Sequence, residues 1–243
     1  MVNVALIIPA YNEEDRIGRV LQAVGDSRVV NEIIVVSDGS TDHTASVALA
    51  YSKVRVVELA QNRGKGAAMD AGVLATPAQV VGFIDADLIG LTGRHIDDLF
   101  APVVSGQCDM CLGVFRGGRL WSDVSQRLFP YISGQRAMTR QLFERLPNLE
   151  DKGFGAEIAI HDFLKLREEV VQQAVIWRGV SNYYKEQKLG WVEGLRARRR
   201  MYADMVSALR VQRPWTKTAK QAGFLNAFVS LSKPPNDGAR GNR

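Results

Sequence analysis

The chain has 243 residues, 46% of them hydrophobic, which is enough for one large α/β domain or for a domain with an extension. No apolar run approaches the roughly 18 residues of a membrane-spanning helix, and no secretory signal precedes the first strand, so we expect a soluble cytoplasmic protein. The formal net charge of +5 arises from the C-terminal part, because Lys and Arg outnumber Asp and Glu several-fold after residue 184.

Apolar runs with the length of strands alternate with helical patterns along the first half of the chain. The expected order is a strand over residues 6–9, a helix opened by the acids 13–15, a strand over 33–36, a helix over 45–49, a strand over 54–59, a helix over 67–74 and a strand over 80–84. Acids in the first turn of the first helix would suit its dipole. This alternation predicts an α/β fold with a mostly parallel sheet and helices on both faces.

Asp85 and Asp87 follow the last of these strands and are separated by one residue. Alternate side chains of an extended backbone share a face, so both carboxylates are predicted to turn toward one divalent cation. Two solvated loop acids are the alternative for an isolated pair. Polar clusters also follow the three earlier strands, at the edge where such sheets bind ligands, and this favours the metal site.

The clusters after the second and third strands suit a nucleoside diphosphate. Asp38 can accept a hydrogen bond from a base N–H, and the turn of residues 62–66 can approach phosphates while Lys65 neutralises them. The glycines of this turn match neither a Walker loop nor a dinucleotide fingerprint, so neither of those sites is predicted.

Four segments, residues 7–14, 35–42, 62–66 and 85–87, closely resemble in order the nucleotide-sugar half of family 2-like glycosyltransferases. The resemblance implies a glycosyltransferase A-type fold and catalysis that depends on Mg²⁺ or Mn²⁺ held by Asp85 and Asp87, with Asp87 also counted as catalytic. It further implies a nucleotide-sugar site formed by Pro9, Ala10, Tyr11, Glu13, Asp38, Lys65 and Asp85.

The following part of the chain is similar to glucosyl-3-phosphoglycerate synthases and their relatives. The shared motifs are Ser-Gly-Gln-Arg at residues 133–136 and Gly-Phe-Gly-Ala-Glu at residues 153–157. Each motif is expected to lead into a helix, and residues 170–180 are expected to form a late strand.

This second similarity implies acceptor binding by Gly134 and Arg136. Glu157 either orients acceptor or sugar hydroxyls, as a catalytic residue, or caps and salt-bridges its helix. Asn182 lies near the position at which those relatives have a metal-binding His, so it is the third candidate metal ligand.

Cys108 and Cys111 form a lone C-x-x-C in a segment that reads as a strand. A redox motif needs a helix N-terminus and a zinc site needs two more ligands. We therefore predict two ordinary core cysteines whose thiols point to opposite faces of a strand.

The C-terminal part is predicted to hold a helix over residues 189–210 with a basic block at 198–200. That block is either a solvated face or a clamp for an acceptor phosphate. Residues 215–231 could form an amphipathic surface helix with peripheral contact to the inner membrane surface, and the end of the chain reads as disordered. We do not expect nucleic-acid binding, because the aromatic residues are not arranged as stacking platforms.

Together these patterns predict three parts: a nucleotide-sugar half over 1–118, an acceptor half of the same domain over 119–210, and a basic extension over 211–243. The predicted function is metal-dependent transfer of a sugar from a UDP- or GDP-sugar to a small anionic metabolite, by an enzyme that could be a homodimer. The alternatives are transfer to a polyprenyl phosphate at a membrane surface and a non-catalytic nucleotide-sugar-binding module.

Overall fold

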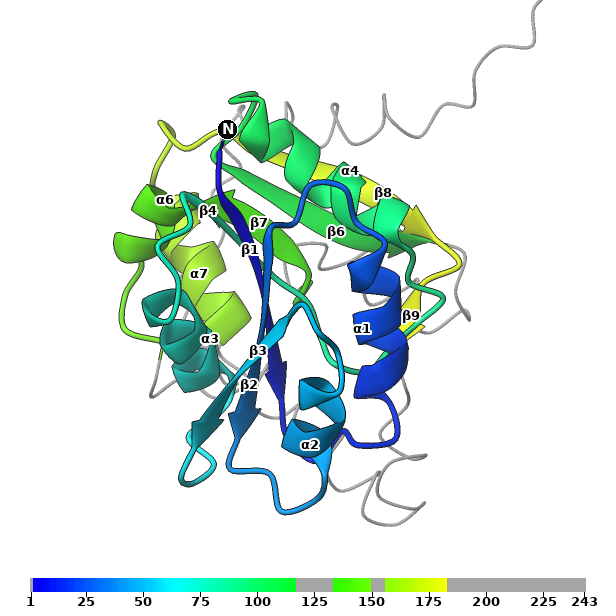
Figure 1. Ribbon diagram of the computed structural model, residues 1–243. Helices are drawn as coiled ribbons and strands as arrows, with labels where there is room; N and C mark the ends of the chain where they lie inside the picture. Colours follow the sequence, from blue (N-terminus) through cyan, green and yellow to red (C-terminus); the bar gives the residue numbers. More distant parts are fainter. Residues whose placement is uncertain (1, 117–132, 150–155, 183–243) are drawn as a thin grey trace, which may run out of the picture. The chain divides into compact units, whose positions relative to one another are not determined.

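The computed structural model describes residues 2–116, 133–149 and 156–182 (Figure 1). The predicted helix over 189–210, the segment 215–231, the tail to residue 243 and residues 153–155 of the second motif lie outside the described residues. The three-part division of the chain therefore stays a prediction.

A seven-stranded sheet forms the centre, in the order β3-β2-β1-β4-β7-β6-β8. Neighbouring strands are parallel except at β7, which runs antiparallel to both β4 and β6. The strands are β1 (Val4–Ala10), β2 (Glu32–Asp38), β3 (Val54–Leu59), β4 (Val80–Phe83), β6 (Met110–Arg116), β7 (Arg136–Thr139) and β8 (Gln172–Arg178). The predicted α/β fold with a mostly parallel sheet is confirmed.

Helices cover both faces of the sheet (Figure 1). One face carries α1 (Ile17–Gly25), α2 (Thr44–Leu49) and α4 (Gly93–Val104). The other carries α3 (Lys65–Leu74), α6 (Arg140–Glu144) and α7 (Ala156–Lys165). A separate antiparallel pair, β5 (Leu88–Ile89) with β9 (Ser181–Asn182), lies beyond the end of β4.

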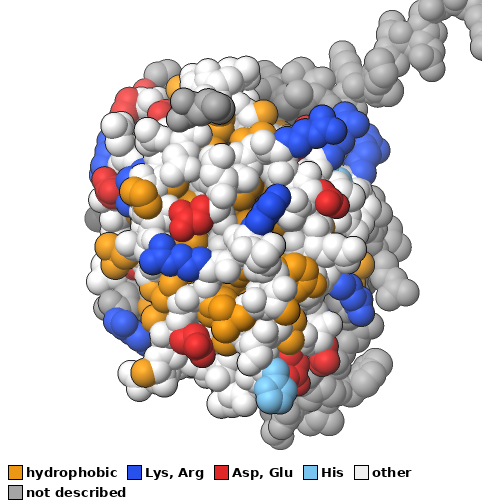
Figure 2. Space-filling view, viewed as in Figure 1, with side chains coloured by type: hydrophobic (Ala, Val, Ile, Leu, Met, Phe, Trp, Pro, Cys, Tyr) orange, Lys and Arg blue, Asp and Glu red, His pale blue; other side chains and the backbone are white. Residues whose placement is uncertain are grey.

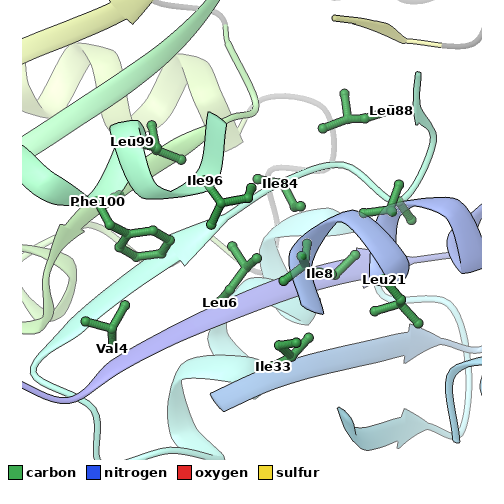
Figure 3. Packing of buried hydrophobic residues seen from close by; sticks show 14 of the residues in the cluster. Val4, Leu6, Ile8, Leu21, Ile33, Ile84, Leu88, Ile96, Leu99 and Phe100 are labelled. Atoms are coloured by element: carbon green, nitrogen blue, oxygen red, sulfur yellow. The ribbon is translucent and has the colours of Figure 1, made fainter. Parts of the chain in front are cut away.

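The largest core cluster lies between the sheet and the helices α1 and α4. Alternate residues of β1, namely Val4, Leu6 and Ile8, point into it and are at most 1% exposed. Figure 3 shows Ile96 and Phe100 of α4 facing these side chains. A Cβ on Gly82 of β4 would lie 2.2 Å from Cζ of Phe100, so the glycine lets α4 pack directly on the sheet.

Helix α1 buries the four apolar side chains predicted from their spacing, Ile17, Val20, Leu21 and Val24. It begins at Ile17, however, and has no acid in its first turn, so the predicted favourable contact of acids 13–15 with its dipole is wrong. The main chain turns at residues 14–16 instead, and the N–H groups of Arg16 and Ile17 donate to the carbonyl of Glu13. The three acids are thus part of the loop at the strand end.

Two further local predictions differ from the structure. The motif at residues 133–136 leads first into strand β7 and only then into α6, because β7 pairs with β4 and β6 on its two sides.

Cys108 precedes β6, which begins at Met110, so the two cysteines do not alternate along one strand. Both are free, buried in the same core cluster, and burial raises their pKa values to about 11 and about 12. Their prediction as core cysteines is confirmed.

Figure 2 shows acidic and basic side chains interspersed over one face, with hydrophobic side chains gathered between them. Among the residues that the structure describes, no helix combines the length and apolar character needed to cross a membrane.

Arg140 closes the C-terminal end of α3. Its Nε donates to the carbonyl of Ala78 at 2.7 Å, and its Nη2 donates to the carbonyls of Val73, at 2.9 Å, and Thr76. A cation at this end also opposes the negative end of the helix dipole. The side chain thereby joins the last turn of α3, at Val73, to the loop that follows the helix, at Thr76 and Ala78.

We expect Arg140→Met to lower the free energy of unfolding by roughly 1–3 kcal/mol, the range for a hydrogen bond that involves a charged group. Arg145→Met is the matched control, because Arg145 pairs with Glu169 at an exposed position. Such surface pairs contribute about 0–1 kcal/mol. Urea unfolding curves of the two variants measure the difference, and equal losses would contradict the role of Arg140.

Candidate functional site

The candidate site lies at the carboxyl ends of the parallel strands. β4 ends at Phe83, so Asp85 and Asp87 fall in the turn between β4 and β5 rather than in the strand itself. The expected alternation along an extended backbone is therefore not what relates the two carboxylates. Both carboxylates instead contact one side chain at the C-terminal end of the described residues.

That side chain is Asn182. The antiparallel pairing of β5 with β9 places Leu88 opposite Asn182. Nδ2 of Asn182 then donates to Oδ2 of Asp85 at 2.9 Å and to Oδ1 of Asp87 at 3.3 Å. The three candidate metal ligands predicted from the sequence thus lie together at one point.

The Asp85 carboxylate is held on both oxygens. Oδ1 accepts from Nζ of Lys65 at 2.6 Å, and Oδ2 accepts from Nε2 of Gln135 at 2.8 Å as well as from Asn182. Gln135 also accepts from the Asp85 main-chain N–H at 3.0 Å, which fixes the residue at two points. Burial raises the pKa of Asp85, but the Lys65 charge and these hydrogen bonds outweigh it and bring the pKa to about 2.

Lys65 joins this carboxylate to helix α7. Its Nζ lies 2.7 Å from Oε1 of Glu157, which is buried at the start of that helix. Burial lowers the pKa of Lys65, yet the two carboxylates more than compensate, so its pKa stands above the ordinary value. A Cβ on Gly134 would lie 2.7 Å from Nζ and 3.0 Å from both Asp85 oxygens, so only glycine lets the chain pass so close to the ion pair.

Arg136 lies behind this cluster and is only 1% exposed. Its Nη2 donates to the main-chain carbonyl of Ser133 at 2.5 Å. Burial lowers the pKa of Arg136, while the charges of Glu157 and Asp85 act in the opposite direction. In this structure its guanidinium contacts the protein interior, and its predicted contact with an acceptor stays a prediction.

Asp38 lies at the end of β2 and is buried. Its two carboxylate oxygens accept from the main-chain N–H groups of Arg63, at 2.7 Å, and Gly64, at 2.8 Å. The carboxylate therefore fastens the turn that carries Lys65 to the neighbouring strand. The predicted contact with a nucleobase would use the remaining lone pairs of the same oxygens.

The end of β1 contributes the other predicted donor-binding residues. Pro9 and Ala10 close the strand, and Tyr11 follows it with 48% of its surface exposed. Glu13 is buried and pairs with Arg16, whose Nε lies 2.5 Å from Oε2 of Glu13. Burial lowers the pKa of Arg16, but Glu13 and Asp87 both act to raise it and the net shift is upward, so Arg16 carries its charge between the first loop and the D-x-D turn.

The loops after β1 and β2 are interlocked by reciprocal hydrogen bonds. The N–H groups of Asn12 and Glu13 donate to the hydroxyls of Ser40 and Thr44, while the N–H of Thr41 donates to Oδ1 of Asn12. Asn12 is in the left-handed region, at φ 54°, a conformation that asparagine tolerates better than most residues. This network holds the strand ends in place around the exposed Tyr11.

The carboxylate of Asp42 also joins these two loops. It accepts from the N–H of Thr44 at 3.0 Å, from the Thr44 hydroxyl at 2.5 Å and from the N–H of Glu14 at 3.1 Å. Burial raises the pKa of Asp42, but these hydrogen bonds outweigh it and hold the pKa below its ordinary value of 3.8.

We expect Asp42→Asn to lower the free energy of unfolding at neutral pH by roughly 1 kcal/mol, because the amide NH₂ replaces one of the two accepting oxygens and the negative charge is lost. A depressed pKa stabilises the folded state above 3.8, and this contribution is lost as the pH falls below that value. The gap between variant and wild type should therefore close on acidification below pH 4. Urea unfolding at a series of pH values checks this, with the exposed Asp26→Asn as the control; a gap that persists under acid conditions would refute it.

Two residues of this site were not predicted from the sequence. Gln135 lies within the Ser-Gly-Gln-Arg motif, but no role was predicted for it. The only sequence signal at Arg16 is its position after three acids. Their contacts depend on partners 50 residues away for Gln135 and on the loop conformation for Arg16.

Comparison with known proteins gives one family match. The model of a family described as glycosyl transferase family 2 matches residues 5–156. Among curated proteins, a dolichyl-phosphate beta-glucosyltransferase of Drosophila melanogaster is 44% identical over 101 residues, with 35% of this chain and 31% of that protein covered. The glucosyl-3-phosphoglycerate synthase of Mycobacterium tuberculosis is 30% identical over 194 residues, with 65% of this chain and 59% of that protein covered. The chain thus spans less than two thirds of these relatives.

Solved structures give a longer match. The crystal structure of the Mycobacterium tuberculosis synthase with Mn²⁺, uridine diphosphate and glucosyl-3-phosphoglycerate has a TM-score of 0.67 at 27% identity, covering 87% of this chain and 81% of that chain. The same synthase with Mg²⁺ and uridine diphosphate also has a TM-score of 0.67, at 26% identity, with 87% of this chain and 81% of that chain covered. These likenesses confirm the glycosyltransferase A-type fold expected from the sequence.

Proposed function

Because the chain belongs to glycosyl transferase family 2, we propose that it transfers a sugar from a nucleoside diphosphate sugar to an acceptor, with Mg²⁺ or Mn²⁺ bound at the D-x-D turn. The observation that carries the proposal is the joining of Asp85 and Asp87 by Asn182, next to the Lys65 ammonium. A cation held there would neutralise charge on the diphosphate, and the Lys65 ammonium would supply a second positive charge.

The residues at the turn fit a hard divalent cation. Asp85, Asp87 and Asn182 offer carboxylate and amide oxygens, the ligands that Mg²⁺ prefers, and waters and phosphate oxygens complete such sites. Within the described residues, no group of three or more His, Cys, Asp or Glu side chains is placed to hold a metal. The amide of Asn182 is thus the third protein group of the proposed set, and a bound cation would neutralise charge on the departing diphosphate.

The chain's own groups have separable roles in this proposal. Tyr11, with Pro9, Ala10 and Glu13 behind it, receives the nucleoside, and Asp38 holds the turn from which Lys65 reaches the diphosphate. Glu157 pairs with Lys65 and holds it in place, and we assign Glu157 the catalytic role of orienting an acceptor or sugar hydroxyl. Gly134 keeps the acceptor side of the ion pair open, because any side chain there would collide with Lys65.

We propose a small anionic metabolite as the acceptor, of the class of phosphoglycerate. The match to the synthase that makes glucosyl-3-phosphoglycerate covers 65% of the chain, whereas the match to the dolichyl-phosphate enzyme covers 35%. At 65% of 243 residues, the longer match cannot be confined to residues 1–118, whereas a match over 35% of the chain could be. The higher identity of the shorter match, 44%, supports transfer to a polyprenyl phosphate as the second candidate.

A transfer assay tests the function and separates the two acceptors. The full chain is incubated with UDP-glucose or GDP-glucose and Mn²⁺, with 3-phosphoglycerate in one arm and a dolichyl phosphate in detergent in the other. We expect nucleoside diphosphate release in the phosphoglycerate arm. Release in the polyprenyl arm alone would favour the second candidate. Donor binding without release in any arm would leave only the nucleotide-sugar-binding module.

A further inference from the structure

The three candidate ligands of the proposed cation carry carboxylate or amide groups. Asp85 and Asp87 supply carboxylates, and Asn182 is the described side chain that contacts both. Within the described residues, no histidine or cysteine joins Asp85 and Asp87 in a group that could hold a metal, and the two cysteines lie in the core. The kind of donor atom in such a set determines which cations it prefers.

We propose that Asn182 sets the cation preference of the site, favouring hard cations such as Mg²⁺ over softer ions such as Co²⁺. This inference rests on the proposed function, since it takes the D-x-D turn as the metal site. Carboxylate, carbonyl and water oxygens suit Mg²⁺ and Mn²⁺, whereas an imidazole nitrogen favours later transition metals. A neutral amide at residue 182 keeps the donor set free of nitrogen.

The side chain is also placed to serve both states of the site. In the structure its NH₂ group faces the two carboxylates and donates to each. A half-turn of the amide about its last side-chain bond puts the carbonyl oxygen in the place of the nitrogen, and this torsion is a soft one. An amide has both a donor and an acceptor, so one residue can occupy both roles without titrating.

The pairing of β9 with β5 fixes the position of residue 182 through the main chain, whichever side chain that residue carries. Asn182 lies opposite Leu88 in the β5–β9 pair, and Leu88 is only one residue beyond Asp87. A substitution at residue 182 therefore changes the donor atom while the strand pairing keeps it facing the turn. Ser181 is the neighbouring residue in the same strand and provides the matched control.

The test measures binding directly by titration calorimetry, using Mg²⁺ and Co²⁺ separately in the presence of saturating UDP. The quantity of interest is the ratio of the Co²⁺ affinity to the Mg²⁺ affinity. We expect Asn182→His to raise this ratio roughly tenfold or more, because the added ligand is an imidazole nitrogen. Asn182→Asp retains an oxygen donor, so its ratio should stay close to that of the wild type, as should the ratio of Ser181→Ala.

Three outcomes decide the matter. An unchanged ratio in Asn182→His, with both metals still bound, would mean that residue 182 does not touch the cation, and the inference falls. A shift of equal size in Asn182→Asp would show that the preference does not follow the donor atom, which also overturns it. Absence of any metal binding by the wild-type protein would instead refute the metal site in the proposed function. Circular dichroism of each variant verifies that the fold is retained.

Discussion

Asp87→Ala is expected to abolish metal-dependent binding of a nucleoside diphosphate. The remaining carboxylate, Asp85, already accepts from Lys65, Gln135 and Asn182, so it has little capacity left for a cation. Asp87 accepts from Asn182 at 3.3 Å, and its charge contributes to the raised pKa of Arg16. Removing it takes away the principal anionic ligand of the proposed site.

Calorimetric titration with UDP in the presence and absence of Mn²⁺ measures this effect. The wild type should bind more tightly with Mn²⁺, and the variant should bind equally weakly in both conditions. Asp26→Ala, which removes an exposed acid at the end of α1, should leave the metal dependence intact. If Asp87→Ala kept the full Mn²⁺ effect, the cation would have to bind elsewhere.

Lys65→Met is expected to weaken both donor binding and the fold. The ammonium lies 2.6 Å from Asp85 and 2.7 Å from Glu157, and each side chain in this group is at most 23% exposed. Without the Lys65 ammonium, the largely buried carboxylates of Asp85 and Glu157 lose the positive charge that they share. Removal of one partner of such a pair costs roughly 3 kcal/mol of stability. Loss of a charged hydrogen bond to the diphosphate should weaken donor binding by roughly 1–3 kcal/mol as well.

Two measurements separate these effects. Urea unfolding gives the change in stability, and calorimetry with UDP and Mn²⁺ under conditions where the variant is folded gives the change in binding. Lys53→Met is the control for each, because Lys53 is exposed beside β3. A stable variant with normal UDP affinity would show that Lys65 neither holds the carboxylates together nor reaches the donor.

The first half of the fold could be predicted because its signals are local. The strands β1 to β4 are apolar runs between turn residues, and the buried face of α1 follows from helical spacing. The carboxyl ends of parallel strands meet at one edge, so the residues after them could be placed in one site before any coordinates were known.

The second half could not be predicted to the same depth, because its structure depends on distant partners. Arg136 opens a strand and is buried, although arginine rarely is, because β4 and β6 pair with β7 on both sides. Gln135 contacts Asp85, and Asn182 contacts Asp85 and Asp87, only through that same tertiary arrangement. Spacing within the sequence contains no information about such pairings, so residue roles there came from resemblance alone.

The short pairing of β5 with β9 also determines the stage of folding at which the proposed metal site can form. Asp85 and Asn182 are 97 residues apart in the chain, and contacts of such separation form against a large loss of chain entropy. A chain synthesised only as far as α7 would already contain the parallel strands β1 to β4 and both aspartates, yet not the amide that joins them. Tight capture of a divalent cation would then report that folding has proceeded through residue 182, because the site would become competent only once β9 has paired with β5.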